Sequence, residues 1–325
     1  MNRRDDAMST TPSDASRTDA DNARFRVGVT LGFSAYFIWG LLTLYWKALK
    51  EFDAFELIGW RIVTSTIILV AAMLATRRFF PLLQTLRNTR LVARIGLASV
   101  FLTINWTTYV WAVVNKHVLE VALGYFIAPV FTIVVGVFVL REKLSLRQRI
   151  AVGFAVSGIA VLTIAYGRVP WIALVIASSW TTYGYLKKQI SLPPLESLTA
   201  EVLLLFVPAA LFVAYTWNGA GSVPTTANTL SLVLVLFTGV ITAVPLLLFA
   251  GASQRTPLTI IGPMQYVVPT TNFLLGWLLF NEEVTKAKLS GFVLIWICLA
   301  VVLIDLFSVQ WQARRLRQQS ASSLR

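Results

Sequence analysis

Arg61 is the one cationic residue inside a long apolar segment of this 325-residue chain. An arginine at the centre of a membrane helix costs about 2.5–3.5 kcal/mol on insertion scales, so it usually has a partner or a water-filled cavity. In such a cavity the guanidinium could bind an anionic or carbonyl group of a small molecule. Alternatively, Arg61 is a structural anchor, because it lies about four residues from the end of its segment and its side chain could reach the interface.

Glu201 lies 140 residues after Arg61, near the start of another apolar segment. A carboxyl group with little water around it can bind a proton, which makes Glu201 a proton-coupling candidate. The alternative is a carboxylate among the cytoplasmic headgroups. We expect no ion pair with Arg61, because the two segments would place these residues about half of the ~30 Å hydrocarbon core apart. The sequence therefore predicts two separate half-sites.

Polar and aromatic side chains complete the candidate site. Amide and indole groups within lipid need hydrogen-bond partners, which either a neighbouring helix or a ligand supplies. In the first case they only hold helices together. In the second case they line a pocket suited to amphipathic or aromatic metabolites and planar drugs. The substrate-binding residues predicted beside Arg61 are Tyr36, Trp39, Asn105, Trp106, Tyr125, Gln265 and Tyr266.

Two prolines, Pro129 and Pro269, lie near the middles of apolar segments. Each removes a backbone hydrogen bond, kinks its helix and frees a carbonyl group at mid-membrane depth. Interrupted helices at matching places in two halves are a pointer to a transporter's binding site. The alternative is a role in packing alone, since proline is frequent in membrane helices.

The composition of the chain fixes the elements that must position these residues. Hydrophobic residues make up 57% of the chain and charged residues 13%, against about 25% charged in soluble domains. The net charge of +13 does not indicate nucleic-acid binding, because the basic residues lie in short loops between apolar segments. With only one histidine, His117, and one cysteine, Cys298, no metal site, cofactor or disulfide is expected.

Ten apolar segments are each long enough to cross ~30 Å of hydrocarbon as a helix. Their lack of period-2 alternation excludes a β-barrel, so the predicted fold is an all-α integral membrane protein. The segments cover residues 27–46, 57–76, 95–114, 121–140, 150–167, 171–186, 198–217, 231–251, 258–280 and 290–306.

The distribution of lysine and arginine predicts the orientation of these spans. If the N-terminal segment is cytoplasmic, 21 basic residues fall on the cytoplasmic side and six outside. Basic residues favour the cytoplasmic side. We therefore expect a multi-pass membrane protein with both termini in the cytoplasm.

A shift of 140 residues aligns the two halves of the chain. The pairs that it superimposes are Glu56 and Glu196, Arg61 and Glu201, Pro129 and Pro269, Gly136 and Gly276, and Glu142 and Glu282. Each half then holds five helices, and because five is odd the second half enters the membrane from the opposite side. This predicts a 5+5 inverted-topology repeat. The expected divisions are a disordered cytoplasmic tail (1–26), two repeats (27–167 and 168–306) and a basic cytoplasmic tail (307–325).

Several strings of residues carry a family resemblance. They are NWTTYVWAVVNKHVLEVALGYFIAPVFTIVVGVFVLREKLSLRQ (105–148), TAVPLLLFAGASQ (242–254), GPMQYVVPTTNFLLG (262–276), IWICLAVVLID (295–305) and AYFIWG (35–40). Over residues 27–305 the chain resembles the RarD group of the EamA-like transporter family, within the drug/metabolite transporter superfamily. The resemblance implies a ten-helix inverted-repeat permease that exports solutes, of the kind usually labelled chloramphenicol-resistance permeases.

The predicted function is efflux of small amphipathic or aromatic metabolites or drugs by alternating access, with proton coupling as a hypothesis and the protein acting as a monomer or homodimer. Two alternatives stay open at this point. A membrane-embedded enzyme would need an Asp-rich, Ser/His or metal-binding motif, and no such motif is present in the sequence. A non-transporting receptor or scaffold would give the inverted repeat no purpose.

Overall fold

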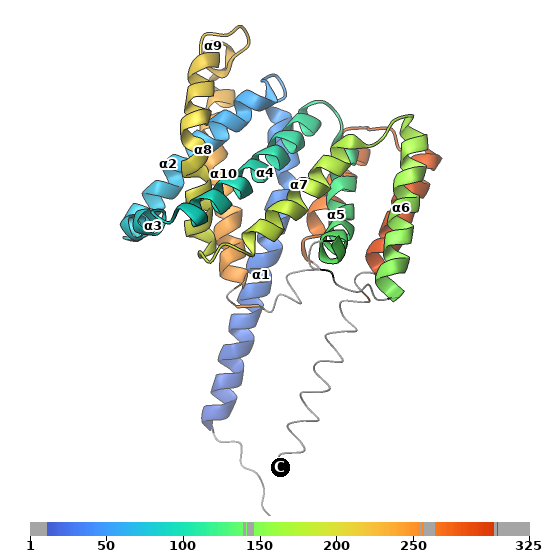
Figure 1. The fold of residues 1–325 in the computed structure, drawn as a ribbon, viewed down its shortest axis with the longest axis horizontal. Helices are drawn as coiled ribbons and strands as arrows, with labels where there is room; N and C mark the ends of the chain where they lie inside the picture. Colours follow the sequence, from blue (N-terminus) through green and yellow to red (C-terminus); the bar gives the residue numbers. More distant parts are fainter. Residues whose placement is uncertain are drawn as a thin grey trace, which may run out of the picture.

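The computed structural model describes residues 12–138, 141, 146–253, 255–256, 264–301 and 304. Every regular element in this part of the chain is a helix (Figure 1). The first six are α1 (Pro12–Ala48), α2 (Ala54–Ala75), α3 (Phe79–Thr85), α4 (Thr89–Val114), α5 (Val118–Phe138) and α6 (Leu146–Tyr166). The others are α7 (Trp171–Lys187), α8 (Pro194–Thr216), α9 (Val223–Thr226), α10 (Thr229–Ser253), α12 (Val267–Leu274), the π-helix η1 (Leu275–Leu279) and an unlabelled helix over residues 286–301.

Seven of these helices are long and apolar enough to cross a bilayer: α1, α2, α4, α5, α6, α8 and α10. The chain is therefore an all-α membrane protein with many spans. The other three predicted spans coincide with α7, with α12 and η1 together, and with the helix at 286–301, which are shorter within the described residues. The arrangement of ten spanning helices stays a prediction.

The start of α1 differs from the prediction of a disordered tail over residues 1–26. Helix α1 begins at Pro12. Proline is favoured at the first helical position, because its missing N–H would have no partner there. No glycine or further proline separates Pro12 from the apolar part of the helix, so the polar segment continues directly into the first span.

Helices α2 and α8 cross in antiparallel directions at close range. Near one end, a Cβ atom added to Gly59 would lie 2.9 Å from the Val213 side chain. Further along, the hydroxyl of Thr66 donates a hydrogen bond to the carbonyl of Val202 (3.3 Å). Small residues allow this approach of backbones within a membrane.

Glycines bring two other pairs of helices together. A Cβ atom added to Gly239 on α10 would lie 2.5 Å from the backbone of Thr64 on α2. On the helix at 286–301, a Cβ atom added to Gly291 would lie 2.5 Å from the Leu162 side chain on α6. In Figure 1, α6 stands beside this last helix at one side of the bundle.

One turn of π-helix, η1, comes directly after α12. The amide of Phe280 donates to the carbonyl of Leu275, five residues earlier (2.8 Å). Gly276 lies within this turn, and a Cβ atom there would be 3.2 Å from the Leu119 side chain. The π-turn therefore packs directly against the first turn of α5.

Candidate functional site

Arg61 lies buried where several helices meet. Its side chain leaves α2 and is 5% exposed. Its Nε donates a hydrogen bond to the hydroxyl of Thr242 on α10 (3.0 Å). The guanidinium carbon lies 3.8 Å from the ring centroid of Trp106 on α4 and 5.4 Å from that of Trp46 on α1. Helices from both halves of the sequence thus contact this one cation.

Neutral groups, rather than a carboxylate, hold the Arg61 guanidinium. No ion pair between described residues includes Arg61. A desolvated cation over a tryptophan ring gains about 2 kcal/mol or more. The guanidinium has five N–H donors, and within the described part of the chain only Nε donates a hydrogen bond. Arg61 therefore retains donors that could bind an anionic or carbonyl group.

Two further donors are buried without a partner among the described atoms, one on Trp46 beside Arg61 and one on Asn272, which contacts Thr43. The hydroxyl of Thr43 donates to Asn272 (2.6 Å) and shares a hydrogen bond with the hydroxyl of Tyr109 (2.9 Å). Asn272 Nδ2 and Trp46 Nε1 have no partner among the described atoms. An unpaired buried donor costs about 1–3 kcal/mol, which an acceptor on a ligand would recover. The sequence-based prediction missed both residues, although an amide in an apolar segment was a usable signal for Asn272.

Asn105 and Tyr125 form a different group that ties three helices together. Asn105 Nδ2 donates to the carbonyl of Ile176 (3.1 Å) and to the hydroxyl of Ser179 (3.2 Å) on α7. The hydroxyl of Tyr125 on α5 donates to Asn105 Oδ1 (3.1 Å). Both the nitrogen and the oxygen of the Asn105 side-chain amide are therefore hydrogen-bonded within the protein. In this conformation Asn105 holds helices together, which was one of its two predicted roles.

The two prolines occupy different helical positions. Pro129 lies inside α5, where its missing N–H leaves the carbonyl of Tyr125 without a helical partner. Residues 257–263 lie outside the described part of the chain, so the predicted kink at Pro269 stays a prediction. The chain makes a turn at Gln265 and Tyr266, and α12 then begins, with Pro269 in its first turn. Proline is tolerated there because a first-turn N–H has no partner within the helix.

The remaining predicted aromatic residues lie in separate places. Tyr36 and Trp39 pack against each other and against Phe249 on α10, with ring centroids 5.3–5.9 Å apart. Gln265 is exposed, and Tyr266 packs on the hydrophobic cluster that joins α5, α6 and the helix at 286–301. Trp39, Trp106 and Tyr125 pack on one hydrophobic cluster that contains Trp46 and Tyr109, whereas Tyr266 packs on a second cluster.

Glu201 is fully buried and has close partners. Its carboxylate forms an ion pair with Lys187 on α7. The hydroxyls of Tyr183 (3.1 Å) and Ser197 (3.3 Å) also donate to it. Lys187 donates in turn to the hydroxyl of Ser197 (2.7 Å). The sequence-based prediction did not include Lys187, because the two residues lie on different helices.

Arg61 on α2 and Glu201 on α8 lie at different levels along these two antiparallel helices. The neighbours Gly59 with Val213 and Thr66 with Val202 place residue 209 of α8 level with Arg61. At 1.5 Å per residue, Glu201 is then about 12 Å further along the helix axis. The cation and the carboxylate belong to two distinct sites.

A bundle of long apolar helices around a buried, unpaired arginine is the architecture of a multi-span transport protein, and comparisons with known proteins agree. Residues 26–164 match the model of the EamA-like transporter family. "Protein RarD" of Streptomyces exfoliatus is 40% identical over 92% of this chain and 93% of its own length. "Uncharacterized transporter YojE" of Bacillus subtilis is 34% identical over 90% and 97%. The chain belongs to the EamA-like transporter family, within its RarD group.

A solved structure supports the fold alone. It superposes with a TM-score of 0.56 at 18% identity, covering 86% of this chain and 98% of the other.

The family is one of transporters, and the relatives are bacterial proteins. The chain is therefore a membrane transport protein rather than an enzyme.

Proposed function

We propose that this protein is an inner-membrane permease that exports small amphipathic or aromatic metabolites or drugs by alternating access. The observation that carries the proposal is the buried guanidinium of Arg61. It faces Trp106, has no carboxylate partner among the described residues, and lies beside Trp46, whose indole N–H has no partner among the described atoms. Such a site suits a solute that combines an aromatic or apolar body with an anionic or carbonyl group.

A 5+5 inverted repeat of ten spans is part of the proposal, and helix packing supports it. Taking η1 with α12, the repeat would relate α1 to α7, α2 to α8, α4 to α10 and α5 to α12. Helix α1 packs on α10 and α12, and correspondingly α7 packs on α4 and α5. Helix α10 packs on α2, and α4 on α8. Exchanging the partners converts each of these contacts into another observed contact, as a two-fold relation requires.

Equivalent glutamates tie the two halves together at opposite ends. At one end, Glu56 of the first half accepts a hydrogen bond from the amide of Val223 in the second (2.9 Å). At the other end, Glu196 of the second half forms an ion pair with Arg78 of the first (3.2 Å). Rocking one half against the other would break and remake contacts of this kind, which suits alternating access.

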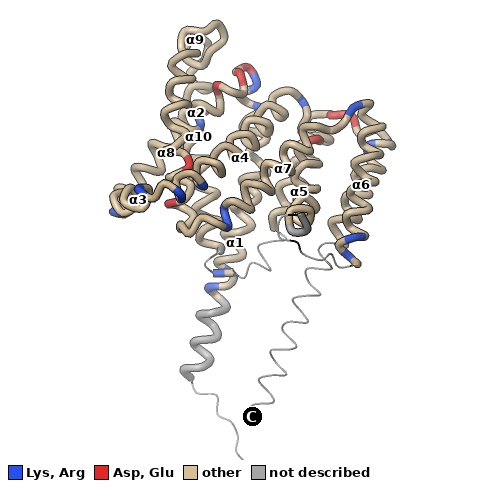
Figure 2. Tube along the Cα trace, viewed as in Figure 1, with Lys and Arg blue, Asp and Glu red and all other residues tan. Residues whose placement is uncertain are grey.

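The proposed topology has both termini in the cytoplasm. Figure 2 shows most charged residues in the connections and at the helix ends, with the helix middles largely free of charge. The end that carries α3 and the start of α6 would be cytoplasmic under the 21-to-six distribution of basic residues. The end at which α1 finishes and α5 begins would be external.

Glu201 remains the candidate for proton coupling. Protonation of its carboxyl group would release Lys187, which now forms an ion pair with it. With α2 and α8 crossing between them, Arg61 and Glu201 would serve half-sites nearer opposite sides of the membrane. Substrate binding at one half-site and proton release at the other would then be coupled through the motion of these two helices.

The test is uptake into inverted membrane vesicles that contain the protein. The panel holds amino acids, aromatic acids and chloramphenicol, each with and without an imposed proton gradient. We expect uptake of at least one aromatic or amphipathic solute, lost in Arg61→Ala and retained in Arg90→Ala, a control at an exposed residue in the first turn of α4. Equal uptake by Arg61→Ala and wild type would refute the role of Arg61. A flat panel with folded protein would refute the proposed substrate class.

A further inference from the structure

A cavity lies at the end of the bundle where α1 finishes and α5 begins. Its volume is about 420 Å³, within the range of small-molecule sites. Arg61 is not among its lining residues, and it lies at the other end of α1 from the polar N-terminal segment. Five stretches of the chain line it: the end of α1, the connection from α4 to α5, the end of α6, the loop after η1, and the helix at 286–301.

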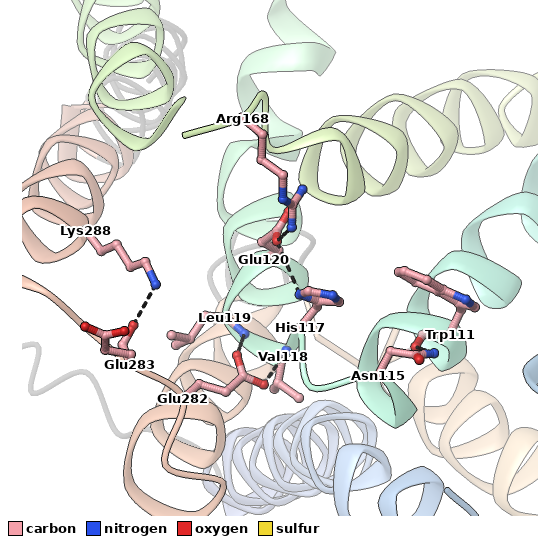
Figure 3. A network of polar contacts seen from close by, with 10 residues as sticks. All are labelled: Trp111, Asn115, His117, Val118, Leu119, Glu120, Arg168, Glu282, Glu283 and Lys288. Atoms are coloured by element: carbon pink, nitrogen blue, oxygen red, sulfur yellow. Dashed lines mark hydrogen bonds and ion pairs between the residues drawn. The ribbon is translucent and has the colours of Figure 1, made fainter. Parts of the chain in front are cut away.

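The two buried or half-buried carboxylates in this cavity already have partners (Figure 3). Glu120 is 2% exposed and forms an ion pair with Arg168, and His117 Nδ1 lies 3.5 Å from it. Glu282 accepts hydrogen bonds from the amides of Val118 (2.7 Å) and Leu119 (2.9 Å) at the start of α5. Arg168 thus compensates the charge of Glu120, whereas the two amides stabilise the charge of Glu282 without cancelling it.

Three lysines in the cavity lack such compensation. Lys47, Lys116 and Lys288 line it, and no described carboxylate lies within 4.0 Å of their Nζ atoms. Lys47 and Lys288 donate only to backbone carbonyls, those of Val113 (3.1 Å) and Glu283 (3.0 Å). Opposed to these three cations, the exposed carboxylate of Glu283 is the one described acidic group in the lining without a partner. The cavity therefore carries an excess of positive charge.

The same cavity has an apolar wall with an unused hydroxyl. Phe280, Leu119 and Tyr166 supply its apolar surface. The ammonium group of Lys288 lies 4.7 Å from the centroid of the Tyr166 ring, and that of Lys47 5.1 Å from Phe280. The hydroxyl oxygen of Tyr166 is buried and has no hydrogen-bond partner among the described atoms. A phenol O–H is a good donor to a carboxylate oxygen.

We propose that this cavity binds the carboxylate of a small amphipathic acid. Lys116 and Lys288 bind the carboxylate, the Tyr166 hydroxyl donates to it, and the apolar part of the solute packs on Phe280. The site is separate from the Arg61 site, and binding here does not require that the protein transport the same solute. Under the proposed topology it opens to the outside.

Equilibrium binding of benzoate to the full-length protein tests the proposal. The protein is held in nanodiscs of zwitterionic lipid, and benzyl alcohol serves as the uncharged analogue. We expect benzoate to bind more tightly than benzyl alcohol. One unit charge at about 4 Å contributes about 1 kcal/mol in a water-like dielectric, or about fivefold in Kd. Lys288→Gln and Lys116→Gln should therefore each raise the Kd for benzoate about fivefold.

Lys286→Gln is the matched control, since Lys286 is exposed two residues from Lys288 and does not line the cavity. It should leave the Kd for benzoate unchanged. Equal binding of benzoate and benzyl alcohol, or an equal loss in Lys286→Gln, would overturn the proposal. The cavity could instead bind the negatively charged headgroup of a lipid, and nanodiscs that contain anionic lipid test this alternative. If anionic lipid displaces benzoate from wild type, the site holds a lipid headgroup and the solute proposal fails.

Discussion

Replacing Glu282 by alanine should destabilise the protein, because this one carboxylate caps the start of α5. Glu282 lies in the loop after η1, in the second half of the chain, whereas Val118 and Leu119 open α5 in the first half. The first amides of a helix have no partner within the helix, and their dipole favours a negative charge. The substitution removes both acceptors and leaves two buried residues with unpaired amides.

The expected magnitude comes from the two hydrogen bonds. A hydrogen bond to a charged group contributes about 1.5–3 kcal/mol, and the charge near a helix start adds about 0.3–1 kcal/mol. Glu282 is only half-buried, so water will replace part of the lost interaction. We therefore expect Glu282→Ala to lower the free energy of unfolding by about 2–3 kcal/mol. Glu282→Gln should cost less, because one amide oxygen can still accept.

The measurement is the free energy of unfolding in an SDS–detergent titration. Glu283→Ala is the control, since Glu283 is the exposed neighbour whose carboxylate makes no described ion pair. That control should change stability by less than about 0.5 kcal/mol. If the two alanine variants lose the same free energy, the capping role of Glu282 is wrong.

Three further predictions use other contacts. Arg61→Lys keeps the charge but loses the planar fork, so it should retain binding of anionic solutes better than Arg61→Ala, measured as Kd; equal loss would contradict a charge-based role. Glu201→Gln should cost about 1–3 kcal/mol, because the half-buried Lys187 loses its carboxylate partner, and Lys187→Met in the same chain should restore part of that free energy in unfolding titrations. Unchanged pH dependence of transport in Glu201→Gln would exclude its proton role. Gly239→Ala should destabilise by at least about 1 kcal/mol through contact with α2, whereas Gly153→Ala, which meets nothing within 4 Å, should stabilise slightly.

The spans could be predicted because a helix surrounded by lipid must be apolar along its length, and this is visible in the sequence. The predicted segment 57–76 lies almost entirely within α2, and 231–251 lies within α10. Local sequence could not give the side-chain partners, which come from distant helices. Glu201 pairs with Lys187 and Glu282 caps α5, and neither contact leaves a periodic pattern.

The sequence singles out Arg61, because a cation in an apolar segment is costly. It does not single out Trp46, since one of eleven tryptophans in a membrane protein carries no distinguishing signal. Pro269 lies in the first turn of α12, and the predicted kink there depends also on residues 257–263, which lie outside the described part of the chain.

The π-turn at Leu275–Leu279 fixes the direction in which the next loop leaves the helix. A π-turn contains one more residue than a turn of α-helix. Deleting a single residue there would therefore convert it into an α-helical turn. Each residue of an α-helix advances the chain by about 100° around the axis. Such a deletion would leave the segment beyond it facing nearly the same way, whereas a deletion within α12 would rotate that segment by about 100° and carry Glu282 away from the amides of Val118 and Leu119. The position of the Glu282 carboxylate therefore depends on the number of residues in α12, and α12 should tolerate substitutions more readily than changes in length.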